Sequence, residues 1–219
     1  MTEDFADLSR RIAGIRDQVP DEGLELADMD PDPVVEFAAW LEMALAAHPG
    51  WPNAMTLATA DASGAPSSRT VLLKGVDETG FTFFTNHESR KGRELAVNPR
   101  ASLTFYWPAL ERQVCVRGSV EQVSRSESQA YFETRPVGSR IGAWASQQSR
   151  EIPDRTELER KVAELSETLG DDVPLPEHWG GYRLTPVAFE FWKSRRNRLH
   201  DRFLYERQDT GWRRARLSP

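Results

Sequence analysis

The chain has 219 residues, of which 39% are apolar and 10% aromatic, and its formal net charge is −6. This composition suits one globular domain, with or without extensions, whose apolar side chains can fill a core. The negative charge argues against general nucleic-acid binding, which depends on neutralising phosphates, and favours small anionic ligands for any local basic cluster. No apolar run can span a bilayer and no signal peptide is recognisable, so we expect a cytoplasmic protein that does not contact a membrane.

Cysteine and histidine are scarce in this chain. Cys115 is the single cysteine, which rules out an internal disulfide and leaves too few thiols for a cysteine-rich zinc site. The four histidines are scattered and match no zinc-ligand spacing. We therefore expect no metal site.

The first 33 residues are predicted to form an arm outside a single domain that spans residues 34–219. The arm is charged and interrupted by prolines, so we expect at most one weak helix, partial disorder and a small contribution to the core. Apolar residues then recur at helical spacing from Val34 to Leu45, with Asp32 as N-cap and Pro33 in the first turn. This pattern predicts an amphipathic helix that packs on a sheet.

A group of strands is predicted after that helix. Residues 54–60 alternate as a strand does, and residues 69–76 and 81–85 are rich in β-branched and aromatic side chains. Asp, Glu, Thr and Gly fill the gap at residues 77–80. We therefore expect residues 69–85 to form a β-hairpin.

A basic helix start is predicted directly after the hairpin. It begins at Ser89 and places Arg90 and Lys91 in its first turn, although a helix N-terminus intrinsically favours negative charge. A serine hydroxyl, free backbone N–H groups and an Arg-Lys pair are typical of a phosphate site, with Arg69 and Lys74 as further cations on the neighbouring strand. The alternative is a basic turn exposed to solvent.

Two more strands complete the pattern of an antiparallel barrel. Residues 101–107 form an aromatic-rich strand, and residues 112–123 form a long strand in which Gly118 predicts a bulge. Several strands with short connections favour a closed or nearly closed antiparallel barrel over βαβ units.

A second candidate phosphate site follows the long strand. Ser124 is predicted to cap a helix that runs through residue 134, with Glu127 completing a capping box. Tyr131 and Arg135 lie one turn apart on this helix, and Ser139 is expected in the loop after it. The three side chains suit a phosphate ester, and the alternative is a tyrosine packed on the core beside a solvated arginine.

The last third of the chain is predicted to contain a peripheral helix at residues 156–169 and strands that flank a basic segment. If residues 199–205 are extended, alternation places Arg198, His200 and Arg202 on one strand face, opposite Leu199 and Phe203. Cationic and proton-exchanging groups on one face suggest a ligand site, and a solvated strand face is the alternative.

Several motifs resemble the pyridoxine/pyridoxamine 5′-phosphate oxidase family, whose members are FMN enzymes of the split-barrel fold. The likeness covers about residues 52–219, and the motifs are SSRTVLLKG (67–75), FFTN with SRKGREL (83–95), FYWPALERQVCVRG (105–118), YFETRPVGSRIGAWASQQS (131–149), HWGGYRL (178–184) and FW with RLHDR (191–202). It implies a mainly β fold with flanking helices, an antiparallel Greek-key FMN-binding split barrel. It also implies a homodimer whose C-terminal strands complete FMN sites at the subunit interface.

The resemblance also assigns ligand contacts. FMN contacts within one subunit would be Arg69, Val71, Leu72, Lys74, Phe84, Thr85, Ser89, Arg90 and Lys91. The partner subunit would add Gln113, Gln148, Ser149, Trp192 and Arg202. The substrate phosphate would contact Lys74, Tyr131, Arg135 and Ser139, and the catalytic residues Arg198 and His200 would lie beside the pyridine ring.

The implied reaction oxidises pyridoxamine or pyridoxine 5′-phosphate to pyridoxal 5′-phosphate and reduces O2 to H2O2. In it, Arg198 and His200 would hold the substrate ring over the flavin. One alternative is an FMN oxidase that acts on another small aromatic compound, for example a secondary metabolite. A second is a non-enzymatic split barrel that binds flavin or haem.

Overall fold

The computed structural model describes residues 2–14, 22–47 and 50–219. Its helices are α1 (Thr2–Gly14), α2 (Pro33–Ala47), α3 (Arg90–Val97), α4 (Arg125–Glu133), α5 (Val137–Ala145) and α6 (Arg155–Leu169), with short 3-10 helices η1 (Leu26–Asp28), η2 (Pro108–Leu110) and η3 (Arg196–Arg198). Its strands are β1 (Ala54–Ala60), β2 (Pro66–Leu72), β3 (Gly75–Asp77), β4 (Gly80–Asn86), β5 (Arg100–Trp107), β6 (Arg112–Gln122), β7 (Trp179–Lys193), β8 (Asp201–Arg207) and β9 (Trp212–Arg216).

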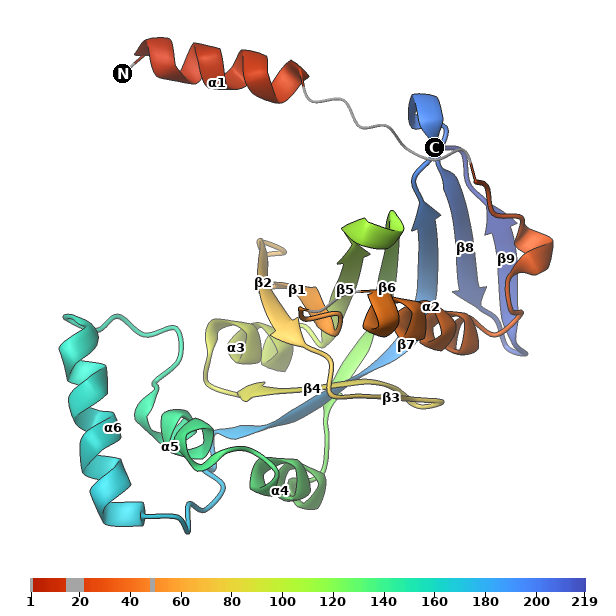
Figure 1. The fold of residues 1–219 in the computed structure, drawn as a ribbon. Coiled ribbons are helices and arrows are strands. Elements are labelled where there is room, and N and C mark those ends of the chain that lie inside the picture. The colour runs from red at the N-terminus through yellow and green to blue at the C-terminus, as the bar shows by residue number, and fades with distance from the viewer. Residues whose placement is uncertain (1, 15–21, 48–49) are drawn as a thin grey trace.

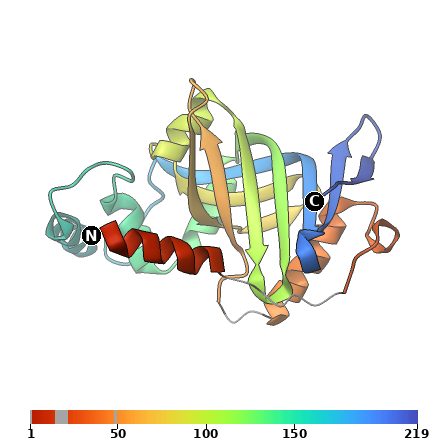
Figure 2. The same cartoon turned by 90° about the horizontal axis from the view of Figure 1, so that it is seen from above.

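The strands form one curved sheet in the order β2-β1-β5-β6-β7-β4-β3, and β8 and β9 extend it from β7. The strand pairs are antiparallel throughout the described residues, as expected. Figures 1 and 2 show the sheet curling around the core, with α4, α5 and α6 at one end of the molecule and the β8–β9 hairpin at the other. The predicted mainly β architecture with flanking helices is confirmed.

The predicted strand at residues 69–76 is in fact two strands. β2 pairs with β1, whereas β3 pairs with β4, so only the second half belongs to the expected hairpin. Between them, Leu73 N donates to Asn53 O at 2.9 Å and Lys74 N donates to Thr82 O at 2.8 Å. The backbone therefore changes its hydrogen-bonding partner here, although the side-chain pattern continues unbroken.

Helix α2 closes the core, as its apolar pattern predicted. Asp32 Oδ1 accepts a hydrogen bond from Val34 N at 2.8 Å and so caps the first turn. Phe37 lies edge-on to Phe81 and to Phe105, with ring centroids 4.8 Å apart in both pairs. Because these rings come from α2, β4 and β5, the helix joins strands that do not pair with one another.

The arm contributes more to the core than expected. Its predicted helix is present as α1, and residues 15–21 lie outside the described residues. Met29, however, is buried, and Tyr205 Oη donates to Asp30 O at 2.8 Å. Asp201 Oδ2 accepts from Leu24 N at 3.0 Å. These bonds fasten residues 24–30 to the strands β8 and β9.

Helices α4 to α6 surround a second, smaller core cluster that contains Phe132, Ile141 and Trp179. Ser124 Oγ caps α4 by accepting from Glu127 N at 3.1 Å, but the Glu127 carboxylate pairs with Arg183 at 2.8 Å. The predicted capping box is therefore only half realised. Helix α6 has no buried residue, in line with its predicted peripheral place.

Strand β6 contains the expected bulge. Its register with β7 shifts between Arg117 and Gly118. A Cβ atom on Gly118 would lie 2.0 Å from Thr185 O, so only glycine allows this close approach of the two strands. Among the described helices, none combines the length and the apolar content that crossing a membrane requires.

Candidate cofactor and substrate site

A cavity of about 870 Å³ opens beside β2, β4 and the first turns of α3 and α5. It brings together most of the side chains predicted to bind a ligand: Arg69, Val71, Leu72, Lys74, Phe84, Thr85, Arg90, Lys91, Tyr131, Arg135, Ser139, Gln148 and Ser149. It is also lined by residues that sequence reasoning missed, chiefly Trp51, Ser67 and Trp179. A space of this size suits a bound cofactor together with a small substrate.

Ser89 was predicted to contact the FMN phosphate, but it does not line the cavity and instead holds the start of α3 beside it. It is fully buried, and its Oγ accepts from Gly92 N at 3.3 Å and donates to Asn86 O at 2.7 Å. It is thus the N-cap of α3, as predicted. A Cβ on Gly92 would lie 2.0 Å from His87 O, so glycine lets the first turn of α3 fold against the preceding loop.

Lys91 is a buried cation at the start of α3. Its side chain is surrounded by neutral acceptors: Nζ donates to Gln148 Oε1 at 2.6 Å, to Thr85 Oγ1 at 3.1 Å and to Ser89 Oγ at 3.3 Å. Burial, and to a smaller extent the charge of Arg69, lowers the pKa of Lys91 to about 8. An anionic ligand that neutralises this ammonium would be bound strongly.

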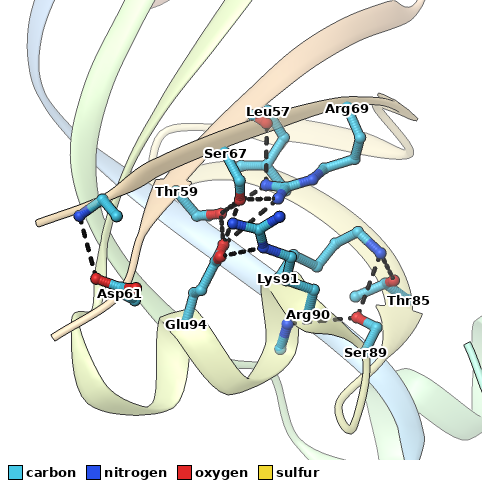
Figure 3. A network of polar contacts seen from close by, with 12 residues as sticks. Leu57, Thr59, Asp61, Ser67, Arg69, Thr85, Ser89, Arg90, Lys91 and Glu94 are labelled. Carbon is cyan, nitrogen blue, oxygen red and sulfur yellow. Dashed lines mark hydrogen bonds and ion pairs between the residues drawn. The ribbon is translucent and has the colours of Figure 1, made fainter. Parts of the chain in front are cut away.

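A carboxylate that sequence reasoning missed connects the other two cations. Glu94 Oε1 accepts from Arg90 Nε at 2.8 Å, and Glu94 Oε2 lies 3.4 Å from Arg69 Nη2 (Figure 3). The one available signal was the four-residue spacing of Arg90 and Glu94, which is typical of an ion pair on a helix. Burial raises the pKa of Glu94, but hydrogen bonds from Ser67, Thr59 and Arg90 outweigh it and lower that pKa to about 2.

Aromatic rings and a second set of cations form the other part of the cavity. Tyr131 stacks on Phe84 with ring centroids 4.0 Å apart, and Lys74 Nζ lies 5.9 Å from the centre of the Tyr131 ring. The Arg135 guanidinium lies 4.6 Å from the centre of the Trp179 ring. Its Nη1 is buried without a hydrogen-bond partner among the described residues, and burial lowers the pKa of Arg135. A buried, unpaired donor of this kind fits an anionic ligand group.

The expected convergence of Tyr131, Arg135 and Ser139 on one space is confirmed, although Ser139 was placed wrongly. Ser139 does not lie in a loop but in the first turn of α5, where its N–H donates to Pro136 O at 2.9 Å. Pro136, with an extended backbone (ψ 144°), is the N-cap of α5, so α5 begins at Val137 only a few residues after the end of α4 at Glu133. The roles of these residues toward a substrate remain predictions.

Gln148 and Ser149 lie where the resemblance did not place them. They were expected to reach the flavin site from the partner subunit, but they line the cavity of their own chain. The hydrogen bonds from Lys91 Nζ and from Thr85 Oγ1 (3.2 Å) to Gln148 Oε1 hold the glutamine there. The spacing of the motifs could not predict this position, because it depends on contacts between Gln148 and residues far away in the chain, Thr85 and Lys91.

The remaining predicted residues form a separate cluster on β6, β7 and β8. Trp192 is the register partner of both Gln113 and Arg202, and the rings of Trp192 and His200 lie 4.6 Å apart. His200 Nδ1 accepts from Arg195 N at 3.1 Å, which places the proton of the neutral ring on Nε2. None of this cluster lines the cavity.

Arg198 does not share a strand face with His200 and Arg202, so this prediction was wrong. It lies in η3, and Asn197 and Arg198 have φ values of 57° and 64°, which turn the chain before β8 begins at Asp201. The alternation holds only from residue 200 onward, where Asp201 and Phe203 are buried. Non-glycine residues with such φ values are uncommon and are found at functional loops.

A curved antiparallel sheet beside a cavity with cations at a helix N-terminus is the arrangement of a split-barrel protein with a candidate site for a phosphorylated ligand. Comparison with family models matches residues 43–169 to "Pyridoxamine 5′-phosphate oxidase". Residues 179–219 match the "Pyridoxine 5′-phosphate oxidase C-terminal dimerisation region". The chain therefore belongs to the pyridoxamine 5′-phosphate oxidase family.

Curated relatives and solved structures agree with this membership. A pyridoxine/pyridoxamine 5′-phosphate oxidase of Ralstonia nicotianae is 56% identical, covering 95% of this chain and 99% of the relative. The one from Pseudomonas paraeruginosa is 54% identical and covers 97% and 100%. The structure of PhzG from Burkholderia lata is 35% identical with a TM-score of 0.85, covering 91% and 99%. An FMN-binding protein of Nostoc punctiforme shares the fold at 20% identity and a TM-score of 0.68, covering 84% and 97%.

Proposed function

We propose that this protein is an FMN-dependent oxidase that converts pyridoxamine or pyridoxine 5′-phosphate to pyridoxal 5′-phosphate, with O2 as the electron acceptor. The observation that carries the proposal is the presence of two sets of cations in one cavity: Arg69, Arg90 and Lys91 on one side, Lys74 and Arg135 on the other. Two phosphorylated ligands require two such sets. Family membership and the names of relatives at 54–58% identity support the same reaction.

The residues around the start of α3 fit the phosphate of FMN. Lys91 is buried with neutral partners, and Arg90 reaches the same space from the first turn of a helix, whose free N–H groups favour an anion. Bound FMN would supply the redox chemistry, because a flavin can take a hydride from the substrate and reduce dioxygen. Val71 and Leu72 on β2, with Phe84 and Thr85 on β4, line the part of the cavity left for the flavin ring.

The second set of cations fits the phosphate of the substrate. Arg135 offers its unpaired Nη1, Ser139 offers a hydroxyl at a helix start, and Lys74 lies across the Tyr131 ring. Each charge-assisted hydrogen bond to a phosphate contributes about 1.5 to 3 kcal/mol net. These contacts would hold the substrate, while the stack of Tyr131 on Phe84 keeps one wall of the cavity apolar.

A second subunit is needed to join the two clusters. The β8–β9 hairpin lies at the end of the molecule away from α4, α5 and α6 (Figures 1 and 2). His200, which directly precedes β8, does not line the cavity of its own chain. The family's dimerisation region at residues 179–219 includes Trp192, Arg198, His200 and Arg202. In the proposed homodimer, these residues and Gln113 enter the cavity of the partner, where Arg198 and the Nε2–H of His200 orient the substrate ring.

Anaerobic reduction of the flavin tests the proposed reaction. The purified, flavin-loaded protein is expected to lose its yellow colour when pyridoxamine 5′-phosphate is added without oxygen. Admitting air should restore the colour and yield one H2O2 for each pyridoxal 5′-phosphate formed. A sample that stays yellow with both vitamin B6 phosphates would refute the proposal.

The likeness to PhzG favours a second candidate, an FMN oxidase of a reduced tricyclic aromatic acid. That structure was solved in complex with tetrahydrophenazine-1-carboxylic acid. Such a ligand carries a carboxylate and no phosphate, so Lys74, Tyr131, Arg135 and Ser139 would lack their phosphoryl partner. Bleaching by a reduced phenazine acid but not by pyridoxamine 5′-phosphate would select this candidate.

A further inference from the structure

Glu94 is a buried carboxylate among the side chains that organise the proposed FMN-phosphate side of the cavity, and neither the motifs nor the family description assigns it a role. It lies on the second turn of α3, where it is 5% exposed and contacts side chains of β1, β2 and α3 (Figure 3). A negative charge beside a phosphate site would normally weaken phosphate binding. Its burial there therefore calls for a physical explanation.

Two hydroxyl groups link Glu94 to Arg69. Thr59 Oγ1 donates to Glu94 Oε2 at 2.5 Å and accepts from Arg69 Nη1 at 2.5 Å. Ser67 Oγ donates to the same carboxylate oxygen at 2.6 Å and accepts from Arg69 Nη2. A guanidinium can only donate, so each hydroxyl must accept from Arg69 and send its own proton to Glu94. An ionised carboxylate is thus the group that allows both hydroxyls to face Arg69 with their lone pairs.

The same carboxylate also orients Arg90 and offsets one of the positive charges of this group. Glu94 Oε1 accepts from Arg90 Nε, which leaves the terminal nitrogens of Arg90 available to the cavity that this residue lines. Arg69, Arg90 and Lys91 together with Glu94 carry two net positive charges, and Asp61 interacts with Arg90 without an ion pair between them in the described residues. A phosphate monoester at neutral pH carries close to two negative charges, so the group is matched to its ligand.

We propose that Glu94 is a positioning residue for the FMN phosphate, which aligns Arg69 and Arg90 through its hydrogen bonds. This inference rests on the proposed FMN site. The groups that face Lys91 are Thr85, Ser89 and Gln148, which are neutral, and the charged Arg69 and Glu94. Burial and Arg69 lower the pKa of Lys91, and Glu94 alone among these groups raises it.

The test is the pH dependence of FMN binding by Glu94→Gln, measured by quenching of flavin fluorescence on full-length protein freed of flavin. Loss of the Glu94 charge removes the group that raises the pKa of Lys91, so Lys91 should lose its proton at a lower pH in the variant. At pH 6.5, where Lys91 stays protonated, we expect FMN to bind the variant about three- to tenfold more weakly, because the amide has one acceptor oxygen where the carboxylate uses two. At pH 8.5 we expect this difference to grow by about fivefold, because the variant has lost more of the Lys91 proton than the unsubstituted protein, in which the pKa of Lys91 is about 8.

Two further variants separate positioning from folding. Glu94→Asp keeps the charge but shortens the side chain, so FMN should bind more weakly at both pH values with the pH dependence of the unsubstituted protein. Glu159→Gln removes a carboxylate from the exposed ion pair with Arg155 on α6 and should change neither. Thermal unfolding without flavin shows which variants are folded. If Glu94→Gln does not fold, the FMN affinity of Glu94→Asp tests the proposal instead.

The outcomes distinguish this inference from the proposed function. A folded Glu94→Gln variant with the FMN affinity of the unsubstituted protein at both pH values would overturn the role of Glu94, although the FMN site would stand. The same conclusion follows if Glu94→Asp loses FMN binding more steeply with pH than the unsubstituted chain. Absence of FMN binding by the unsubstituted protein would overturn the proposed function, and this inference with it.

Discussion

Arg135 is a residue of the cavity with a hydrogen-bond donor that, among the described residues, remains free for a ligand. Its guanidinium packs over the Trp179 ring, and its Nη1 is buried without a hydrogen-bond partner in the part of the chain that the structure describes. An unpaired buried donor costs about 1 to 3 kcal/mol, and a ligand that accepts from it recovers this cost. The side chain is therefore pre-organised for an anion that approaches from the cavity.

Replacing Arg135 tests this interpretation. Arg135→Lys keeps the charge but loses the planar fork and the stacking on Trp179. We expect KM for the phosphorylated substrate to rise about 10- to 100-fold, the equivalent of one lost charge-assisted hydrogen bond, with little change in kcat per bound flavin. Steady-state kinetics with measured FMN occupancy decide this.

The matched control for that experiment is Arg155→Lys, because Arg155 lies on exposed α6 and pairs with Glu159 far from the cavity lining. It should leave KM and kcat unchanged. If Arg135→Lys loses FMN as readily as it loses substrate affinity, the division of the cavity into two phosphate sites is wrong.

At the scale of elements, the proposed binding of FMN depends on the turn from β4 into α3. Ser89 caps the helix, and Gly92 allows the helix to pack on the backbone of His87. The cations that follow Ser89 point into the cavity only because the first turn of the helix is held in this place. A change that shifts the turn should therefore affect stability and FMN affinity together.

Two glycine substitutions separate packing from helix propensity. Gly92→Ala places a Cβ within 2.0 Å of His87 O, so we expect a loss of about 1 to 3 kcal/mol in the free energy of unfolding, together with weaker FMN binding. Gly142→Ala in α5 meets no atom within 4 Å and should stabilise the protein by about 0.5 to 1 kcal/mol. Urea unfolding and FMN titration measure both effects. Equal stability changes for the two variants would contradict the packing argument.

At the scale of the whole molecule, the sheet separates two functional clusters that the proposed reaction needs together. The cavity lies beside β2, β4, α3 and α5, whereas His200 and Trp192 lie where β7 meets the β8–β9 hairpin. Residues 24–30 brace that hairpin through Tyr205 and Asp201. The orientation of His200 is thus tied to the arm as well as to the sheet.

Subunit mixing tests whether the two clusters come from different chains. Arg135→Ala and His200→Ala homodimers should each be nearly inactive, because every site lacks one required group. After dissociation and random reassociation, half of the dimers are mixed and each mixed dimer has one intact site, so we expect about a quarter of full activity. Activity that does not recover in a verified mixture of dimers would show that each site is built from one chain.

Most local structure was determined by the sequence itself. The caps at Asp32, Ser89 and Ser124 and the bulge at Gly118 were predictable because they depend on residues a few positions apart or on one missing side chain. Arg90 and Lys91 at a helix start were recognisable as a candidate phosphate site, but only the burial of Lys91 in the structure argues against the alternative of a basic turn exposed to solvent.

The tertiary structure alone decided how the chain pairs and which side chains meet. The division of residues 69–76 into β2 and β3, the burial of Glu94 and the place of Gln148 beside Lys91 all depend on segments far apart in the chain. The turn at Asn197 and Arg198 likewise has left-handed backbone angles that alternation cannot encode. Local patterns record short-range preferences, whereas these features result from the choice of a distant partner, which is a property of the packed molecule.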